Sequence, residues 1–152
     1  MRATEELSAE TDLAEELLEE ISTIAVVGLS RSFHKDSQFV ARYLQNAGYK
    51  IVPVNPGADE ILGERAYPDL ISIPFEVDAV DVFLPPNLLP QAVDQALEIE
   101  PKAIWLQLGT GKNPGEKEKA KEAGIPLFEN RCIKVDHQFL IRPKKNQPTN
   151  NQ

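Results

Sequence analysis

Short apolar runs alternate with amphipathic stretches along most of this chain. The first run, residues 23–28 (TIAVVG), is apolar and ends at a glycine, which is typical of a buried parallel strand. After a polar loop, residues 37–48 place apolar side chains on one helical face, with Ser37 as the expected N-cap and Gly48 as the stop. The next run, residues 50–54 (KIVPV), completes a β-α-β unit of about 30 residues.

The same alternation continues toward the C-terminus. Further elements are predicted as follows: strands over 79–83, 103–106 and 125–128, and helices capped by Asn87 and by Asn113. Residues 58–77 indicate turns and are compatible with a short helix over 69–73. The pattern predicts one α/β domain, a Rossmann-like, doubly wound, mostly parallel sheet of about five strands with helices on both faces.

Two segments flank the predicted domain, which spans residues 23–141. Residues 1–22 have apolar side chains at helical spacing, with Ser8 or Thr11 as a cap, and they carry eight acidic side chains against one arginine. We expect an acidic helix that packs on the domain; a helix that binds a partner is the alternative. Residues 142–152 are polar and rich in Asn, Gln and Pro, which predicts a disordered tail.

Composition excludes several classes of protein. A chain of 152 residues suits one domain, and a single cysteine rules out an internal disulfide or a multi-cysteine metal site. No apolar run approaches the roughly 18 residues of a membrane span, and no signal peptide is visible, so we expect a soluble, cytoplasmic protein. The acidic N-terminal segment accounts for nearly all of the net charge of −8; the near-neutral remainder argues against nucleic-acid binding.

Ligands of such sheets bind beyond the carboxyl ends of the strands, here after Gly28, Val54, Phe83 and Leu106. The loop after the first strand leads into a helix N-terminus, where free N–H groups and the helix dipole favour an anion. It supplies hydroxyl groups and positive charges that suit a phosphate, from Ser30, Arg31, Lys35 and Ser37. An ordinary solvated loop is the alternative interpretation.

A standard dinucleotide site is disfavoured by two absences. The first loop has Gly28 but lacks the G-x-G-x-x-G pattern, because Ser30 takes the place of the second glycine. After the second strand, the chain has no acidic residue before Asp59 that could bind the ribose 2′-hydroxyl of NAD. It also has no basic residue there that could bind the 2′-phosphate of NADP. NAD and NADP are therefore not the expected ligands.

The other strand ends are rich in proline. Asn55-Pro56 follows the second strand and Pro85-Pro86 the third, and rigid apolar edges of this kind suit a flat adenine or an aliphatic arm. The simpler interpretation is that these prolines only end the strands and shape the loops. Gln107, after the fourth strand, could meet a ligand amide or satisfy loop backbone.

Several of these pieces together resemble the stand-alone coenzyme A-binding domain family, whose fold is similar to the N-terminal domain of the succinyl-CoA synthetase α subunit. The resemblance covers about residues 21–140 and keeps its order. The matching pieces are VVGLS (26–30), ARYL (41–44), GY (48–49), PVNP (53–56), ILG (61–63), YP (67–68), VDVF (80–83), WLQLG (105–109), AG (123–124) and RCI (131–133).

The resemblance implies coenzyme A (CoA) or an acyl-CoA as the ligand, with no metal. The pyrophosphate would lie on the first loop and helix, at Gly28, Ser30, Arg31, Lys35 and Ser37. The turn of Val54, Asn55 and Pro56 and the edge of Phe83, Pro85 and Pro86 would flank the adenosine, and Gln107 would lie near the pantetheine. The synthetase domain has a basic residue just after its prolyl turn, whereas this chain has Gly57-Ala58-Asp59 there.

Catalytic residues are not evident. The synthetase acts through a phosphorylated histidine on a second domain and an ATP-binding partner, and this chain matches neither. We interpret His34 as a loop residue, His137 as a packed one, and Cys132 as a buried thiol that could instead form a disulfide with CoA. The favoured hypothesis is a non-enzymatic carrier, sensor or regulatory module, and a homodimer is plausible. The alternatives are a subunit of a CoA- or nucleotide-dependent enzyme that needs a partner chain, and an adaptor with an emptied nucleotide site.

Overall fold

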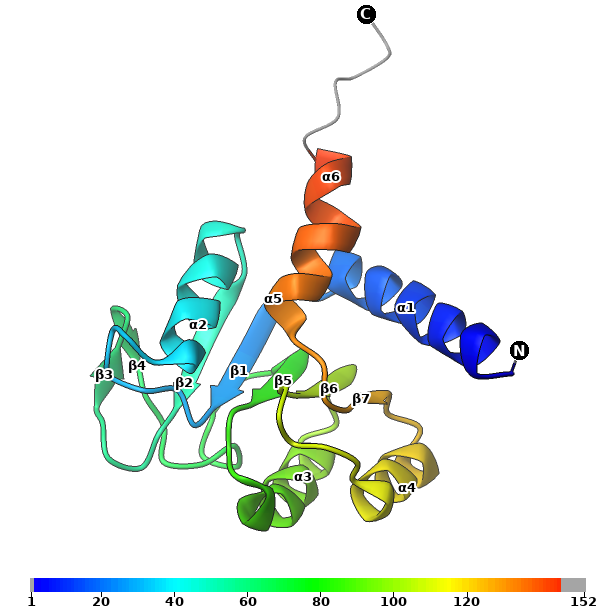
Figure 1. Cartoon of the computed structure of the whole chain (residues 1–152). Helices are drawn as coiled ribbons and strands as arrows, with labels where there is room; N and C mark the ends of the chain where they lie inside the picture. Colours follow the sequence, from blue (N-terminus) through cyan, green and yellow to red (C-terminus); the bar gives the residue numbers. More distant parts are fainter. Residues whose placement is uncertain (1, 146–152) are drawn as a thin grey trace, which may run out of the picture.

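The computed structural model describes residues 2–145. Its centre is a five-stranded sheet in which every pairing is parallel (Figure 1). The strands, in their spatial order, are β2 (Lys50–Val54), β1 (Thr23–Val27), β5 (Ala79–Val82), β6 (Ala103–Leu106) and β7 (Leu127–Phe128). This confirms the expected Rossmann-like α/β sheet, with the strand order of flavodoxin-like folds.

Helices cover both faces of the sheet, which explains why the strands are apolar throughout (Figure 1). One face holds α1 (Arg2–Glu20), α2 (Asp36–Asn46) and a C-terminal helical arm made of α5 (Ile133–Asp136), the π-helical η2 (His137–Ile141) and α6 (Arg142–Lys145). The other face holds the 3₁₀ turn η1 (Pro86–Leu88), α3 (Leu89–Glu98) and α4 (Pro114–Ala123). Alternate residues of β1 serve the two cores: Ile24 and Val26 pack toward α1 and α2, Ala25 and Val27 toward α3.

The C-terminal helical arm contacts the second half of α1, which the sequence did not indicate. The predicted disordered tail begins at residue 142, but Arg142–Lys145 form α6. Lys144 forms ion pairs with Glu15 and Glu19 of α1, so two of the eight N-terminal acids hold the helical arm. The rest of the predicted tail, residues 146–152, lies outside the described residues.

α1 differs from its prediction at its start. It begins at Arg2, so the expected caps Ser8 and Thr11 lie inside the helix. Its second half packs on the domain, with Leu17 and Leu18 in the core, while Leu7 is exposed. Among the described residues, no helix combines the length and apolarity that a membrane crossing needs.

A small hairpin occupies the region that was hardest to interpret. Strands β3 (Glu60–Ile61) and β4 (Glu64–Arg65) are joined by a tight turn, and the predicted helix over 69–73 is instead a turn in which Asp69 accepts hydrogen bonds from Ser72. After the hairpin, Tyr67 bridges to the outer edge of β2: its N–H donates to the Pro53 carbonyl at 3.0 Å, and its own carbonyl accepts the Asn55 N–H at 2.9 Å. The hairpin is thereby held next to the carboxyl end of β2.

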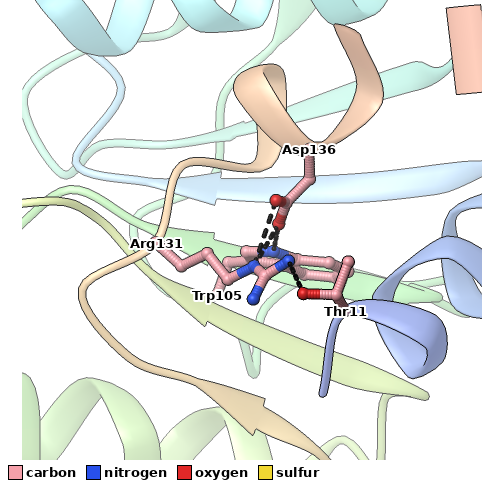
Figure 2. Close-up of polar contacts among 4 residues, drawn as sticks. All are labelled: Thr11, Trp105, Arg131 and Asp136. Atoms are coloured by element: carbon pink, nitrogen blue, oxygen red, sulfur yellow. Dashed lines mark hydrogen bonds and ion pairs between the residues drawn. The ribbon is translucent and has the colours of Figure 1, made fainter. Parts of the chain in front are cut away.

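A buried polar cluster ties α1, β6 and the C-terminal arm together (Figure 2). The Asp136 carboxylate accepts the Trp105 indole N–H at 3.0 Å and the Arg131 Nε–H at 2.8 Å, and Arg131 also donates to the Thr11 hydroxyl at 3.2 Å. Asp136 is buried, and these donors compensate for the water it has lost. Thr11, predicted as a cap, therefore stabilises the tertiary structure.

Loss of this cluster should destabilise the whole domain. Asp136→Ala leaves the Arg131 guanidinium and the Trp105 indole without their acceptor, so we expect a loss of about 3 kcal/mol in the free energy of unfolding. Chemical denaturation measures it. The matched control is Asp94→Ala, which removes an equally charged but exposed partner of Lys119 and should have a much smaller effect. Equal losses in the two variants would contradict the structural role.

Asp81, unlike Asp136, is a buried carboxyl without hydrogen-bond donors around it among the described residues. It lies in the centre of β5 with 0% exposure. Neither of its oxygens has a hydrogen-bond partner among the described residues, and its register partners Val26 and Trp105 belong to the apolar core. Burial raises the pKa of Asp81 well above its usual value, because the charged form cannot be solvated there. Burial therefore favours the protonated form of this side chain in the folded protein.

This carboxyl makes stability fall with rising pH. The folded pKa is above the unfolded one, so the contribution is complete below the unfolded pKa and is lost as the pH rises through the folded pKa. The slope is up to about 1.4 kcal/mol per pH unit. We expect Asp81→Asn to remove this slope in unfolding experiments between pH 5 and pH 8, which are roughly the limits of ordinary maximal stability. Parallel pH profiles for the two proteins would show that Asp81 does not titrate in this way.

Candidate functional site at the carboxyl edge of the sheet

The switch in strand order lies between β1 and β5, because the chain leaves β1 toward β2 on one side and returns to β5 on the other. Gly28 ends β1 at this point with a φ of +83°. A Cβ atom on Gly28 would lie 2.2 Å from the carbonyl oxygen of Phe83, so only glycine allows the two strand ends to come this close. A crevice at the switch point is where ligands of such sheets bind.

Three cavities form a row along this edge. The first, the α2–α5 cavity, has about 460 Å³ and lies among α2, the ends of β5 and β6, and the segment before α5. The second, the α3 cavity, has about 480 Å³ and reaches from β1 and β2 to α3; Leu84 lines both. The third, the hairpin cavity, has about 610 Å³ and shares Asn55 and Pro56 with the second. The shared lining residues show that the three cavities are neighbours along this edge.

Most of the residues singled out in the sequence line this row. The α2–α5 cavity is lined by Phe83, Pro85, Pro86 and Gln107, and the α3 cavity by Gly28, Val54, Asn55 and Pro56. The other four, which are Ser30, Arg31, Lys35 and Ser37, lie on the loop that joins Gly28 to α2 and line none of the three cavities. The loop borders the row because Gly28 lines one cavity and Asp36 another.

The loop between β1 and α2 is held by its own serines. The Ser30 N–H donates to Ser37 Oγ at 3.0 Å, and the Ser32 N–H donates to Ser30 Oγ at 2.9 Å. Ser37 is therefore not the helix cap that the sequence predicted: Lys35 occupies the N-cap position, and the Ser37 oxygen is taken by an amide across the loop. Because both hydroxyl groups act as acceptors here, these bonds leave their hydrogens available for an anion.

The charges on this loop are mixed. Arg31 and Lys35 are exposed, but α2 starts with Asp36, whose carboxylate already occupies the positive end of the helix dipole. The attraction for a phosphate must then come from Arg31 and Lys35. His34 is also exposed and packs edge-on against Phe33, with ring centroids 5.7 Å apart.

Asn55 holds two loops together. Its Nδ2 donates to the Leu29 carbonyl at 2.9 Å, and its Oδ1 accepts the Gly57 N–H at 2.7 Å. Both ends of the amide are engaged within the protein. Asn55 therefore sets the distance between the β1 loop and the β2 turn, and the neighbouring Val54 and Pro56 supply the cavity surface.

The far wall of the α2–α5 cavity is fixed by contacts between β6 and the segment before α5. The Arg131 N–H donates to the Leu106 carbonyl at 3.0 Å, and Asn130 Oδ1 accepts the Gly109 N–H at 2.8 Å. These contacts place Cys132 and Gln107 on the same cavity. Gln107 is 9% exposed, and its Oε1 has no hydrogen-bond partner among the described residues. The cavity thus offers a buried amide and a thiol among apolar walls.

Two further titratable residues are structural. His137 is buried, and its Nδ1 lies 2.8 Å from the Tyr43 hydroxyl, in keeping with its interpretation as a packed residue. Glu129 accepts the Asn113 N–H at 2.6 Å. Across residues 2–145, no group of three or more His, Cys, Asp or Glu side chains is arranged to hold a metal ion.

Arg65 is the residue that the sequence analysis missed. It follows the β3–β4 turn and lines the hairpin cavity beside Asn55 and Pro56. No ion pair within residues 2–145 engages Arg65, although Asp59 and Glu60 line the same cavity. The signal was the Leu62-Gly63 turn, because a hairpin there returns the chain to the end of β2. A positive charge thus stands beside the prolyl turn, although residues 57–59 supply none.

Comparison with known proteins agrees with this geometry. A family model described as a CoA binding domain matches residues 22–138. The uncharacterised protein YneT of Bacillus subtilis is 38% identical over 122 residues, which cover 80% of this chain and 90% of that protein. The Thermus thermophilus structure called cell-free ID.343 is 35% identical with a TM-score of 0.81, over 86% of this chain and 98% of that chain.

A larger relative places the domain in an enzyme. The ADP-forming acetate–CoA ligase II of Archaeoglobus fulgidus is 32% identical over 117 residues, which are 70% of this chain but 17% of the ligase. This chain therefore corresponds to a small part of that enzyme. On the family match and the relatives together, the chain belongs to the CoA-binding domain family.

Proposed function

We propose that this chain binds CoA or an acyl-CoA along the three cavities at the carboxyl edge of the sheet. The observation that carries the proposal is the row of neighbouring cavities itself, with a partly apolar cavity at one end, a cationic loop beside the middle, and Arg65 at the other end. CoA has the same sequence of groups: a pantetheine arm, a pyrophosphate, and an adenosine with a 3′-phosphate. Its family membership makes CoA the ligand class to test first.

The groups are assigned by chemistry. The pantetheine lies in the α2–α5 cavity, between Phe83 and Gln107. The pyrophosphate takes the serine hydroxyl groups and the charges of Arg31 and Lys35. The adenosine lies against Val54 and Pro56, and its 3′-phosphate is attracted by Arg65, which is the positive charge among the lining residues of the hairpin cavity.

A non-catalytic role as a carrier, sensor or regulatory module follows from the chemistry of the lining. The α2–α5 cavity contains one carboxylate, Asp36, and one thiol, Cys132, and the charged residue on its far side is Lys134. Asp36 and Lys134 are the two charged residues that line it, and among the described residues they form no ion pair with each other. Binding, rather than turnover, is the function that this lining supports best.

The second candidate is a subunit that completes a CoA-dependent ligase with a partner chain. Two observations favour it: the relation to acetate–CoA ligases, and two exposed apolar side chains at the α2–α5 cavity, Phe39 at 55% and Leu108 at 61%. Such a partner would cover these side chains. Purification of the chain from its native source distinguishes the two, because a carrier comes alone whereas a subunit comes with an ATP-binding protein.

Calorimetric titration with CoA, beside NAD and ATP, tests the proposed function. We expect saturable binding of CoA without binding of NAD. Arg31→Ala with Lys35→Ala should weaken CoA binding by about 2 kcal/mol, roughly 30-fold in Kd, because charge-assisted contacts are lost. The matched control is Lys50→Ala with Lys102→Ala, which removes the same charge at the amino edge of the sheet and should leave the Kd unchanged. Unchanged affinity in the Arg31/Lys35 variant would place the phosphates elsewhere.

Dephospho-CoA, which lacks the 3′-phosphate, isolates the role of Arg65. The unmodified chain should bind CoA more tightly than dephospho-CoA. Arg65→Ala should remove this preference, by roughly tenfold in Kd, without changing the affinity for dephospho-CoA. The Arg31/Lys35 variant is the control, since both ligands carry the pyrophosphate and both should weaken alike. A preference that survives Arg65→Ala would assign the 3′-phosphate to another group.

A further inference from the structure

We infer that Cys132 is a thiol-exchange site, at which the chain takes one CoA from a CoA disulfide and holds it as a protein–CoA mixed disulfide. The inference rests on the proposed function, because it requires the pantetheine arm to enter the α2–α5 cavity. It goes further in assigning a covalent, reversible modification to a named atom, the Cys132 Sγ.

The first observation is where the main chain places Cys132. The residue before it, Arg131, donates its N–H to the carbonyl of Leu106, the residue before Gln107. Cys132 and Gln107 are each one residue from this bond, and both line the same cavity. Cys132 is 8% exposed and lies at the edge of the core, so the thiol is part of a cavity wall and not of the surface.

The second observation is independent of the thiol. Gln107 is more than nine-tenths buried, lines this cavity, and has an Oε1 atom with no partner in the described part of the chain. A buried amide oxygen without a donor is costly, so a ligand that donates an N–H to it is favoured. The pantetheine arm has amide N–H groups next to its thiol end. Such a ligand amide on Gln107 brings the ligand sulfur toward Cys132.

The third observation concerns charge. Lys134 lines the cavity next to Cys132, and its Nζ lies 5.1 Å from the ring of Phe39, which lines the α2 side. Its ammonium group therefore lies near a second residue that lines the cavity. A positive charge there stabilises the thiolate that leaves on the second CoA.

The reaction is a thiol–disulfide exchange and needs no other oxidant. The Cys132 thiolate attacks one sulfur of CoA–S–S–CoA, a protein–S–S–CoA bond forms, and the bond between the two CoA sulfurs breaks. The electron pair leaves on the second CoA as a thiolate, which takes up a proton from solvent. An excess of a small thiol reverses the step and returns free CoA and the Cys132 thiol.

The test is the rate of adduct formation by the full chain, followed by intact-protein mass spectrometry. With CoA disulfide we expect a mass gain of one CoA less two hydrogens, a rate that saturates with concentration, and full reversal by dithiothreitol. Glutathione disulfide at the same concentration should react at least about tenfold more slowly, because it has no nucleotide with which to bind first. Cys132 is the single cysteine of the chain, so Cys132→Ser gives the background.

Two variants separate a guided reaction from ordinary thiol reactivity. Gln107→Leu keeps the size of the side chain and removes the amide, so it should raise the half-saturating concentration of CoA disulfide and leave the rate with glutathione disulfide unchanged. Arg31→Ala with Lys35→Ala should do the same. A variant that merely loosened the fold would change the rates with both disulfides.

The outcomes are distinct. Equal, unsaturable rates with the two disulfides overturn the inference, and so does the absence of an adduct when Cys132→Ser binds CoA in calorimetry. A third outcome is that no adduct forms and that CoA binds neither to Cys132→Ser nor to the reduced chain. In that case the proposed function fails, and the inference fails with it. Selective, saturable exchange that depends on Gln107 supports both.

Discussion

The close approach of two strand ends is the constraint on which the site depends. The loops after β1 and β5 meet where Gly28 passes the Phe83 carbonyl, with no room for even one methyl group. This contact fixes the position of Gly28, which lines the α3 cavity, relative to Phe83, which lines the α2–α5 cavity. The loop after Gly28 carries the cationic residues and leads into α2, and the prolines after Phe83 continue the wall of the first cavity. One glycine thus sets the spacing of groups that come from distant parts of the sequence.

Several residues that carry the family resemblance stabilise the site through hydrogen bonds within the protein. Trp105 and Arg131 meet at the Asp136 carboxylate under the C-terminal arm, and Asn55 clamps two loops with both ends of its amide. Their neighbours Gln107, Cys132, Val54 and Pro56 line the cavities, and so does Asn55 itself. The motifs that identify the family therefore include residues that support the site as well as residues that line it.

The sequence could predict the elements whose causes are local. The strands followed from continuous apolar runs, and α4 begins after Asn113 and ends at Gly124, in the left-handed conformation, as its residues indicated. Features that depend on distant partners were not accessible. Ser37 lost its capping role to an amide across the loop, and α6 is held by Lys144 bound to acids that lie 125 and 129 residues away in the chain. Arg65 was missed because its position depends on how a hairpin folds back onto β2.

The contact between Tyr67 and the outer edge of β2 has a consequence for the solution behaviour of the protein. An exposed sheet edge invites a strand from another chain, which is a common first step in aggregation. Here Tyr67 is hydrogen-bonded to the Pro53 carbonyl and to the Asn55 N–H, so neither group can pair with an added strand. Pro53 itself has no N–H to donate. The opposite edge strand, β7, pairs over only two residues. Both edges of the sheet are therefore poor templates for added strands, so the fold itself disfavours association of two molecules edge to edge through this sheet.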